Sequence, residues 1–369
     1  MWALIFGVIF LAAAGGFVYL CSRVYGFSFW ERVTENKWLR MLISFAVVVV
    51  PTLILWIILG FMNAAVAVIY LIVFWLISDL AFFIVRKIRK TRFKRRWTAV
   101  PALAATIIYL SVGWALAHNV WVTSYDLKTD KAGGEMRVVM FADSHVGTTF
   151  DGAGLEKQVE KMNGLSPDVV VIAGDFVDDD TDKEDMIAAC RALGKLETKY
   201  GVFLSFGNHD KGYYDSRGYD GDELKAELTK NGVRVLEDET VLIDDRFYIV
   251  GRKDRSEVER AGGRADIAAL CDSIDRDKYV LVIDHQPNDY DAEATAKVDL
   301  VLSGHTHGGQ LFPVNYVGEW LGMNDRTYGY ERREQTDFIV TSGISDWALK
   351  FKTGTKSEIV VVNIKGRTA

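Results

Sequence analysis

Five short polar clusters in this sequence hold five of its six histidines, and each cluster directly follows an apolar run of strand length. The clusters are Asp143-Ser144-His145, Gly174-Asp175-Phe176-Val177-Asp178, Gly207-Asn208-His209-Asp210, Asp284-His285 and Gly304-His305-Thr306-His307-Gly308-Gly309-Gln310. In an open α/β sheet, ligands bind in the crevice outside the carboxyl ends of the strands. A lone histidine is usually a core or surface residue, but this shared placement predicts one polar site built from several strand ends.

The residue types in these clusters favour a site for divalent metal ions. Imidazole, carboxylate and amide oxygen, without thiolate, suit Mn, Fe or Zn in a reactive site rather than a structural zinc ion. Two such ions about 3.5–4 Å apart can bind a phosphate group and generate a hydroxide nucleophile near neutral pH. We therefore predict two divalent metal ions as cofactors, with Mn first and Fe, Zn or Mg as alternatives, and a phosphate ester as substrate.

Taken in order, the clusters resemble the motif series D-x-H, G-D-x-x-D, G-N-H-[DE], H and G-H-x-H of the calcineurin-like metallophosphoesterase superfamily. The resemblance covers about residues 137–364. Within it, the stretch 304–310 and the tail Thr341-Ser342-Gly343-Ile344 with Ser357-Glu358-Ile359-Val360 resemble a bacterial, membrane-associated branch. It implies an α/β fold of four layers, an α/β/β/α sandwich in which helices flank two mixed sheets.

The resemblance also implies a role for each matching position. One metal ion would be held by Asp143, His145 and His307, and the other by Asn208, His285 and His305, with Asp175 bridging the two. His209, beside Asn208, would hydrogen-bond the phosphate and help to protonate the leaving oxygen, while Asp210 would orient the imidazole ring of His209. Asp178 would support the site or its turn without binding metal.

Three further segments are candidates for contact with the substrate. Arg252, followed by Lys253 and Arg255, could bind a phosphate or a lipid headgroup, and a solvated basic loop is equally compatible with the sequence. Residues 213–219 could form a lid, although an ordinary surface loop is slightly favoured. Residues 312–320 could contact a bilayer or an acyl chain, but core packing is the default prediction for so apolar a segment.

The elements that must position the clusters follow Gly133-Gly134, where short apolar runs are separated by amphipathic stretches. The predicted strands are 137–141, 168–172, 202–206, 247–250, 279–283, 299–302, 338–341 and 358–362. The predicted helices are 155–162, 185–196, 223–230 and 264–274. Their alternation in the first part of this region is typical of an α/β domain.

The first third of the chain has a different composition, because four of its apolar runs are about 20 residues long, enough to cross a bilayer as helices. These runs are 2–20, 41–59, 64–85 and 98–121. We therefore predict a four-helix transmembrane domain over residues 1–123, a linker over 124–134 and a phosphoesterase domain over 135–369. Asp79, in the third run, is predicted to be a hydrated carboxylate near the interface, because no cationic partner is evident.

The charge distribution predicts how these helices are oriented. Residues 86–96, between the third and fourth runs, contain eight Lys or Arg and no acid, and four more basic residues lie between the first and second runs. Because cytoplasmic loops collect such charges, both loops are predicted to be cytoplasmic and the catalytic domain extracytoplasmic.

Two other features of the composition exclude partners and cofactors. The residues after Asp130 include 30 basic and 44 acidic side chains, a net charge of −14 that argues against nonspecific nucleic-acid binding. The three cysteines form no C-x-x-C pair, so we predict buried free thiols rather than disulfides or zinc ligands.

Together these features predict a membrane-anchored, dinuclear, metal-dependent phosphoesterase of the cell membrane that hydrolyses phosphate mono- or diesters. Lipid or lipid-linked esters are favoured, because a tethered site meets membrane substrates at a high effective concentration. Two alternatives stay open: a nucleotide-lipid pyrophosphatase at the cytoplasmic face, and a noncatalytic sensor that binds metal or phospholipid. The presence of His209 beside a complete ligand set argues against the sensor, since binding needs no general acid.

Overall fold

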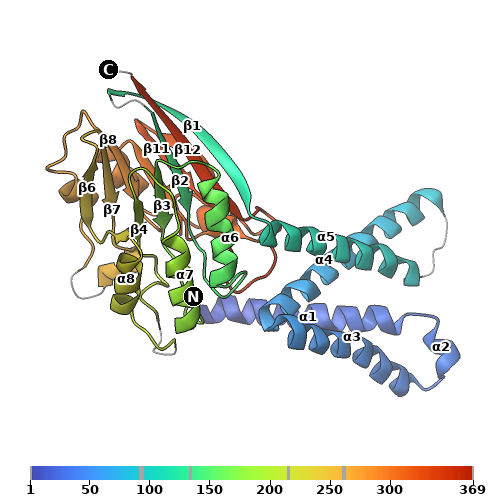
Figure 1. The fold of residues 1–369 in the computed structure, drawn as a ribbon. Helices are drawn as coiled ribbons and strands as arrows, with labels where there is room; N and C mark the ends of the chain where they lie inside the picture. Colours follow the sequence, from blue (N-terminus) through green and yellow to red (C-terminus); the bar gives the residue numbers. More distant parts are fainter. Residues whose placement is uncertain (1, 91–94, 133–134, 214–216, 260–262, 368–369) are drawn as a thin grey trace. The chain divides into compact units, whose positions relative to one another are not determined.

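The computed structural model describes residues 2–90, 95–132, 135–213, 217–259 and 263–367 (Figure 1). The chain divides into two units, Met1–Gly113 and Trp114–Ala369.

Long helices make up the first unit. The helices are α1 (Trp2–Tyr25), α2 (Trp30–Val33), α3 (Lys37–Leu59), α4 (Phe61–Arg89), the short η1 (Arg95–Thr98) and α5 (Ala99–His118), which ends in the second unit. Among the described residues, three helices are long and apolar enough to cross a membrane, namely α3, α4 and α5. The sequence predicted four, and its first run, 2–20, falls on α1, where the side chains of residues 2–12 lie outside the description.

Asp79 has the cationic partner that the sequence did not reveal. Arg23 Nη2 lies 2.5 Å from Asp79 Oδ2, and the Tyr19 hydroxyl donates a hydrogen bond to the same oxygen at 2.6 Å. These partners come from α1, 56 and 60 positions earlier in the chain, so spacing within one apolar run could not show them. The carboxylate is therefore an ion-paired group of the helical unit, as charges in apolar helices usually are.

Two six-stranded mixed sheets form the centre of the second unit. The strands are β1 (Trp121–Ala132), β2 (Glu135–Phe141), β3 (Val169–Ala173), β4 (Val202–Ser205), β5 (Val233–Val235), β6 (Glu239–Ile243), β7 (Phe247–Gly251), β8 (Tyr279–Ile283), β9 (Leu300–Ser303), β10 (Gly329–Arg333), β11 (Thr336–Val340) and β12 (Glu358–Arg367). The first sheet has the order β1-β12-β2-β3-β4-β5 and the second the order β10-β11-β9-β8-β7-β6. Strands β2, β3 and β4 are parallel to one another, as are β7, β8 and β9.

Most helices of this unit cover the outer faces of the sheets. They are α6 (Gly152–Asn163), α7 (Lys183–Leu193), α8 (Gly221–Lys230), α9 (Ile267–Leu270), α10 (Tyr290–Thr295) and α11 (Val317–Trp320), with the short turns η2 (Arg255–Glu259) and η3 (His307–Gly309). Figure 1 shows α6, α7 and α8 along one face of the sheet that contains β2, β3 and β4.

Alternation along the strands builds the four layers. Val139 and Val170 pack in a cluster with residues of α6, α7 and α8, whereas their neighbours Val138 and Val171 pack between the sheets against residues of β8 and β9. On the far side of the second sheet, residues of β8 and β9 pack with α9 and α10. Because successive strand residues point to opposite faces, strands buried on both sides read as continuous apolar runs. The predicted α/β/β/α sandwich is confirmed.

The predicted linker, 124–134, is instead most of strand β1, and residues 133–134 lie outside the description. Strand β1 pairs in parallel with β12, with Trp121 opposite Glu358 and Lys128 opposite Lys365. Strand β1 lies at the edge of its sheet, and its polar and apolar residues alternate instead of forming the continuous apolar run of a central strand. It also follows a membrane-type helix directly, so the sequence suggested a linker there. The long helix predicted over 264–274 is also wrong, since only the four residues of α9 are helical there.

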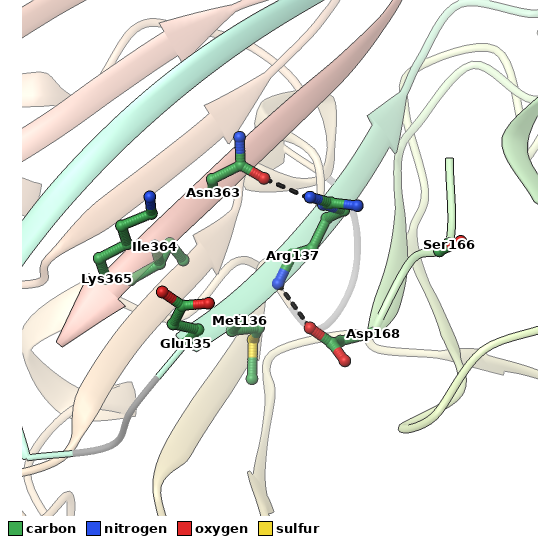
Figure 2. A pocket seen from close by; sticks show the side chains of 8 residues that line it. All are labelled: Glu135, Met136, Arg137, Ser166, Asp168, Asn363, Ile364 and Lys365. Atoms are coloured by element: carbon green, nitrogen blue, oxygen red, sulfur yellow. Dashed lines mark hydrogen bonds between the residues drawn. The ribbon is translucent and has the colours of Figure 1, made fainter. Parts of the chain in front are cut away.

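A surface pocket lies at the opposite end of the first sheet from the predicted site (Figure 2). It forms where β2 and β3 begin, and Arg137 connects its walls. The backbone N–H of Arg137 donates to Asp168 Oδ2 at 2.7 Å, and its Nε donates to Asn363 Oδ1 at 3.0 Å. These polar groups are satisfied by one another, and none of them belongs to the five clusters.

Candidate metal centre

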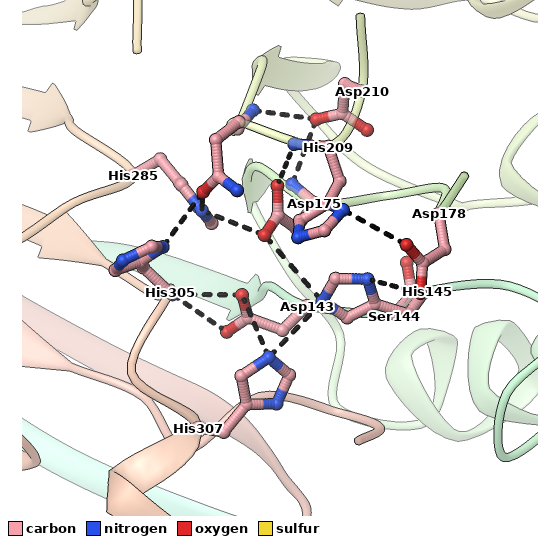
Figure 3. A network of polar contacts seen from close by, with 12 residues as sticks. Asp143, Ser144, His145, Asp175, Asp178, His209, Asp210, His285, His305 and His307 are labelled. Atoms are coloured by element: carbon pink, nitrogen blue, oxygen red, sulfur yellow. Dashed lines mark hydrogen bonds and ion pairs between the residues drawn. The ribbon is translucent and has the colours of Figure 1, made fainter. Parts of the chain in front are cut away.

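The five polar clusters meet where the parallel strands end. Strands β2, β3 and β4 of the first sheet and β8 and β9 of the second each run into one cluster, and Figure 3 shows the side chains converging on a common centre. The arrangement follows from the fold, because parallel strands that share a direction bring their carboxyl ends to one edge.

Asp143, His145 and His307 form the first group, and their ligand atoms all lie within 4.8 Å of one another. His145 Nε2 faces His307 Nε2 at 3.2 Å, and His307 Nε2 lies 3.9 Å from Asp143 Oδ1. All three side chains are buried. One neutral imidazole can donate to the other, but neither offsets the charge of the buried carboxylate. A divalent cation would satisfy all three donors, so this group fits a metal ion.

Asp175, His285 and His305 form the second group, also with ligand atoms within 4.8 Å of one another. His285 Nε2 lies 3.1 Å from Asp175 Oδ2. The side-chain oxygen of Asn208 joins them, at 2.9 Å from His305 Nδ1 and 3.2 Å from His285 Nε2. Because Asp175 Oδ2 also lies 3.7 Å from His145 Nε2, this carboxylate lies between the two groups.

Strained backbone holds these side chains. Five of the seven residues have a left-handed φ between 36° and 71°. They are Asp143, His145, Asp175, His305 and His307. Such conformations cost about 1–3 kcal/mol each and persist where the surrounding structure enforces them, which is typical of functional sites. The loops are also tightly packed, since a Cβ added at Gly207 would lie 2.2 Å from Asp175 Oδ1.

Burial and neighbouring charges set the protonation states of the side chains in both groups. Burial lowers the pKa of His305 to about 4 and holds the pKa of His307 well below its ordinary value, with nearby imidazoles adding to the effect. Although burial opposes it, His285 and His145 lower the pKa of Asp175. Metal ligands must be neutral imidazoles and ionised carboxylates, so His305, His307 and Asp175 favour the form that binds a cation. Two other groups do not: burial raises the pKa of Asp143 to about 6, and, although burial opposes it, Asp175 raises the pKa of His285, so a cation would displace a proton from His285.

His209 lies beside the two groups and is held by carboxylates that the sequence did not assign to it. Its Nδ1 lies 3.0 Å from Asp178 Oδ1 and 3.2 Å from Asp179 Oδ2. Although burial opposes it, the carboxylates of Asp178, Asp175 and Asp179 raise the pKa of His209 to about 9. The ring therefore carries a proton near neutral pH and leaves Nε2 available to the site.

Asp178 contacts a second imidazole as well. Its Oδ2 lies 3.5 Å from His145 Nδ1, and the three residues Asp178, His145 and His209 form a third group with ligand atoms within 4.8 Å. Although burial opposes it, these two imidazoles lower the pKa of Asp178. Asp178 thus supports one residue of the first group and His209 together.

Asp210 does not orient the imidazole of His209, contrary to the sequence-based expectation. Its buried carboxylate accepts hydrogen bonds from the backbone N–H groups of Asp175 at 2.9 Å, Phe176 at 2.8 Å, Val177 at 3.1 Å and Gly207 at 2.7 Å. The physical reason is direction: consecutive side chains of this turn point away from each other, so Asp210 faces the loop after β3 while His209 faces the cluster. Asp210 is a positioning residue for two loops that carry cluster residues.

Two aromatic side chains flank His209: Tyr213, which belongs to the predicted lid or surface loop, and Trp347, which sequence reasoning did not identify. The ring centroids of Tyr213 and Trp347 lie 5.3 Å and 5.7 Å from that of His209. Asn208 Nδ2 donates to the Tyr213 hydroxyl at 2.9 Å, and the Tyr213 backbone N–H donates to Asp179 Oδ1 at 2.7 Å. Both rings are partly exposed, so they border the access to His209.

The predicted lid or surface loop, 213–219, includes residues 214–216, which lie outside the description. The end of this segment is buried. Arg217 Nη1 donates to His209 O at 3.0 Å, Arg217 Nη2 donates to Asp210 O at 2.5 Å, and the guanidinium lies over the ring of Tyr219. Arg217 therefore fixes the backbone of the turn that carries His209.

Arg252 does not face the cluster, and its predicted contact with substrate is wrong. The side chain is 2% exposed, and Nη1 lies 2.9 Å from Asp284 Oδ2, 2.8 Å from Asp289 Oδ2 and 3.3 Å from Glu293 Oε1. Arg264 contacts the same oxygen of Asp284. Carboxylates more than 30 positions later in the chain neutralise Arg252, which local sequence could not show. Arg252 and Arg264 together support the loop that begins at Asp284, next to His285.

Comparison with known proteins agrees with this geometry. The family model for calcineurin-like phosphoesterases matches residues 136–309, a range that contains the five clusters. An uncharacterized metallophosphoesterase of Campylobacter jejuni is 31% identical over 267 residues, covering 72% of this chain and 68% of the relative. One from Aquifex aeolicus is 32% identical over 252 residues, covering 67% and 92%. The chain belongs to the calcineurin-like phosphoesterase family.

A vertebrate relative also combines the two kinds of unit. A protein of Danio rerio described as a transmembrane protein with metallophosphoesterase domain is 29% identical over 241 residues, covering 62% of this chain and 53% of the relative. Together with the three membrane-type helices, this relative supports an association of the present chain with a membrane.

Proposed function

We propose that this protein is a metal-dependent phosphoric ester hydrolase that holds two divalent ions between its sheets. The observation that carries the proposal is the convergence of donor side chains from five strand ends, with two groups whose ligand atoms lie within 4.8 Å of one another. Metallophosphoesterase relatives lead us to expect bound metal, and the side chains in these two groups are of the types that bind divalent ions.

The first ion would be held by Asp143, His145 and His307, and the second by Asn208, His285 and His305, with Asp175 shared. When bound, two such ions neutralise a phosphate group and make water a better nucleophile at neutral pH. Nitrogen and oxygen donors without thiolate favour Mn, Fe or Zn, of which we propose Mn first.

The remaining residues of the site supply and position the proton that the leaving oxygen requires. His209 holds a proton on an imidazole whose pKa is raised to about 9, and Asp178 fixes the ring through Nδ1 at 3.0 Å. We assign to His209 Nε2 a hydrogen bond to the phosphate and protonation of the leaving oxygen. The aromatic rings of Tyr213 and Trp347 border His209 and limit the water around it.

We further propose that the catalytic unit is extracytoplasmic, with α1 as a fourth span, and that it acts on lipid or lipid-linked esters. Eight Lys or Arg in residues 86–96 lie between two helices of membrane type, and such loops are usually cytoplasmic. A reporter fused to the C-terminus tests this topology: activity of a periplasmic reporter supports it, and activity of a cytoplasmic reporter contradicts it.

The central experiment uses the full chain in detergent, because β1 begins before any predicted linker. Metal content and hydrolysis of an aryl phosphomonoester and diester are measured for the wild type, Asp175→Ala, His209→Ala and a control, Asp245→Ala, whose side chain is exposed. We expect the wild type and the control to bind two ions and hydrolyse ester, Asp175→Ala to lose both properties, and His209→Ala to keep its metals but lose most turnover. A wild type that binds no metal, or an Asp175→Ala variant with full activity, would contradict the proposal.

A further inference from the structure

The segment 310–323, which follows the last metal-type cluster, displays apolar side chains instead of burying them. Trp320 and Leu321 are 73% and 70% exposed. Other exposed apolar residues of the segment are Phe312, Val314, Tyr316, Val317 and Met323. The single charged residue of the segment, Glu319, turns back to accept a hydrogen bond from the Thr327 backbone N–H at 2.9 Å. The default prediction of core packing is therefore wrong.

Hydrogen bonds fix this apolar surface to the site. Thr353 N donates to Gln310 O at 2.9 Å, and Phe312 N donates to Thr353 Oγ1 at 3.0 Å. Within the segment, Asn315 is buried, and the short helix α11 forms part of the second half. Large exposed apolar surfaces with a fixed shape mark sites of interaction. A Cβ added at Gly309 would lie 1.8 Å from Asn315 O, so the segment packs against the turn that carries His307.

The loop 351–357, which holds this segment, also holds the residues through which the chain enters the second unit. Ser357 N donates to Leu116 O at 2.9 Å, Trp121 N donates to Ser357 O at 2.8 Å, and the rings of Phe351 and Trp114 are 5.9 Å apart. Trp114 and Trp121 are both exposed. One loop therefore connects the apolar segment with the end of α5, a helix of membrane type.

Exposed tryptophans at the end of such a helix are typical of the headgroup region of a bilayer. Trp320, in the apolar segment, is exposed as well. A solvent-exposed surface of this composition is costly in water, and a bilayer is the apolar phase that the chain meets directly upstream of Trp114.

We propose that residues 312–323 insert into the headgroup region of the bilayer and present the phosphate of a membrane lipid to the metal centre. The inference rests on the proposed hydrolase function and its lipid substrate, and it adds the surface that delivers this substrate. The alternative occupant of the surface, a second copy of this chain, is an outcome of the test.

The first experiment measures where the segment lies. The full chain carries a fluorophore at Leu321→Cys or, as a matched control, at Leu242→Cys, an exposed apolar position on the edge strand β6 of the second sheet. Both variants carry Cys21→Ser, since the other two cysteines are buried. In nanodiscs that contain nitroxide lipid, we expect quenching at position 321 and not at 242. Equal quenching at both positions, or none at 321, overturns the proposal, as does crosslinking of Leu321→Cys between two chains.

The second experiment measures what the segment does. Trp320→Ser combined with Leu321→Ser is compared with Leu242→Ser, using phosphatidic acid in nanodiscs and a soluble aryl phosphate as substrates. We expect the double variant to lose at least about tenfold in lipid hydrolysis, with aryl phosphate hydrolysis unchanged, because two large apolar contacts are removed. An unchanged ratio of the two rates overturns the proposal. If the wild type hydrolyses neither ester, the hydrolase function fails, while the quenching experiment still decides whether the surface lies in the bilayer.

Discussion

Replacement of Asp210 by Asn should unfold the metal centre rather than impair the chemistry of His209. In the native site, Oδ1 of Asp210 accepts from two backbone N–H groups and Oδ2 from two others, at distances of 2.7–3.1 Å. Three of these donors belong to the loop after β3, which carries Asp175, and the fourth is Gly207, next to Asn208. Asparagine keeps one oxygen and turns an NH₂ group toward the other two donors.

The magnitude follows from this count of donors. A hydrogen bond to a charged group contributes about 1.5–3 kcal/mol, and a buried donor left without a partner costs about 1–3 kcal/mol. Two such bonds are lost, so we expect a loss of about 3–5 kcal/mol after partial relaxation of the loops. For a unit of this size, about 2–4 °C of melting temperature corresponds to each kcal/mol, which gives a decrease of roughly 6–20 °C.

The assay is thermal unfolding of the full chain in detergent, together with metal content. Asp179→Asn is the matched control, because Asp179 accepts from one backbone N–H, that of Tyr213, in addition to His209. We expect Asp210→Asn to melt well below both the wild type and this control and to bind less metal. If Asp210→Asn melts within about 2 °C of the wild type with its metals retained and only turnover lost, Asp210 acts on the imidazole after all, and our reasoning is refuted.

Three further predictions concern other parts of the catalytic unit. Chelation of the metals should lower the melting temperature, since a ligand at 100 times its Kd adds about 2.7 kcal/mol, and added Mn should restore it; an unchanged midpoint would speak against bound metal. Arg252→Met should destabilise the fold by about 3–5 kcal/mol, because it removes the guanidinium beside buried Glu293 and one of the two that contact Asp284, and the KM for an aryl phosphate should not change in the folded fraction; a raised KM would restore a substrate role. Glu237→Gln should lower the melting temperature more at pH 7 than at pH 3: although burial opposes it, Lys211 and Lys225 hold the pKa of Glu237 below its ordinary value of 4.5, so its contribution is fully present above pH 4.5 and is lost as the pH falls through the lowered pKa. An equal effect at both values would contradict that assignment.

The positions of the cluster residues were predictable because each one follows a strand that the sequence displays clearly. Strand β3, for example, is buried on both faces and reads as Val169-Val170-Val171-Ile172, so its end at Ala173 is easily located. Once the strand ends are known, parallel pairing brings Asp175 and its counterparts to one edge. Position along the chain was sufficient for this part of the site.

Direction and long-range pairing were not predictable in the same way. His209 and Asp210 are adjacent, and only the backbone of the turn decides that one faces the cluster and the other faces four N–H groups. Arg252 follows a strand end in the sequence, as the true cluster residues do, but carboxylates distant in the chain bury it. Strand β1 pairs with β12 more than 230 positions away, a partner that its own alternation of residues does not reveal.

The buried ammonium group of Lys352 connects the turn beside Asp143 with the end of α5. Lys352 Nζ donates to Ser342 O at 2.6 Å, to Ser345 O at 2.9 Å and to Ser357 Oγ at 3.1 Å. The Ser342–Ser345 turn packs on Asp143, since a Cβ added at Gly343 would lie 2.8 Å from the Cβ of Asp143, while the Ser357 hydroxyl donates to Ala117 O at 2.7 Å. The distance between the first metal group and the end of α5 is therefore set by hydrogen bonds within one folded unit. A flexible linker of the kind that the sequence predicted would leave that distance variable.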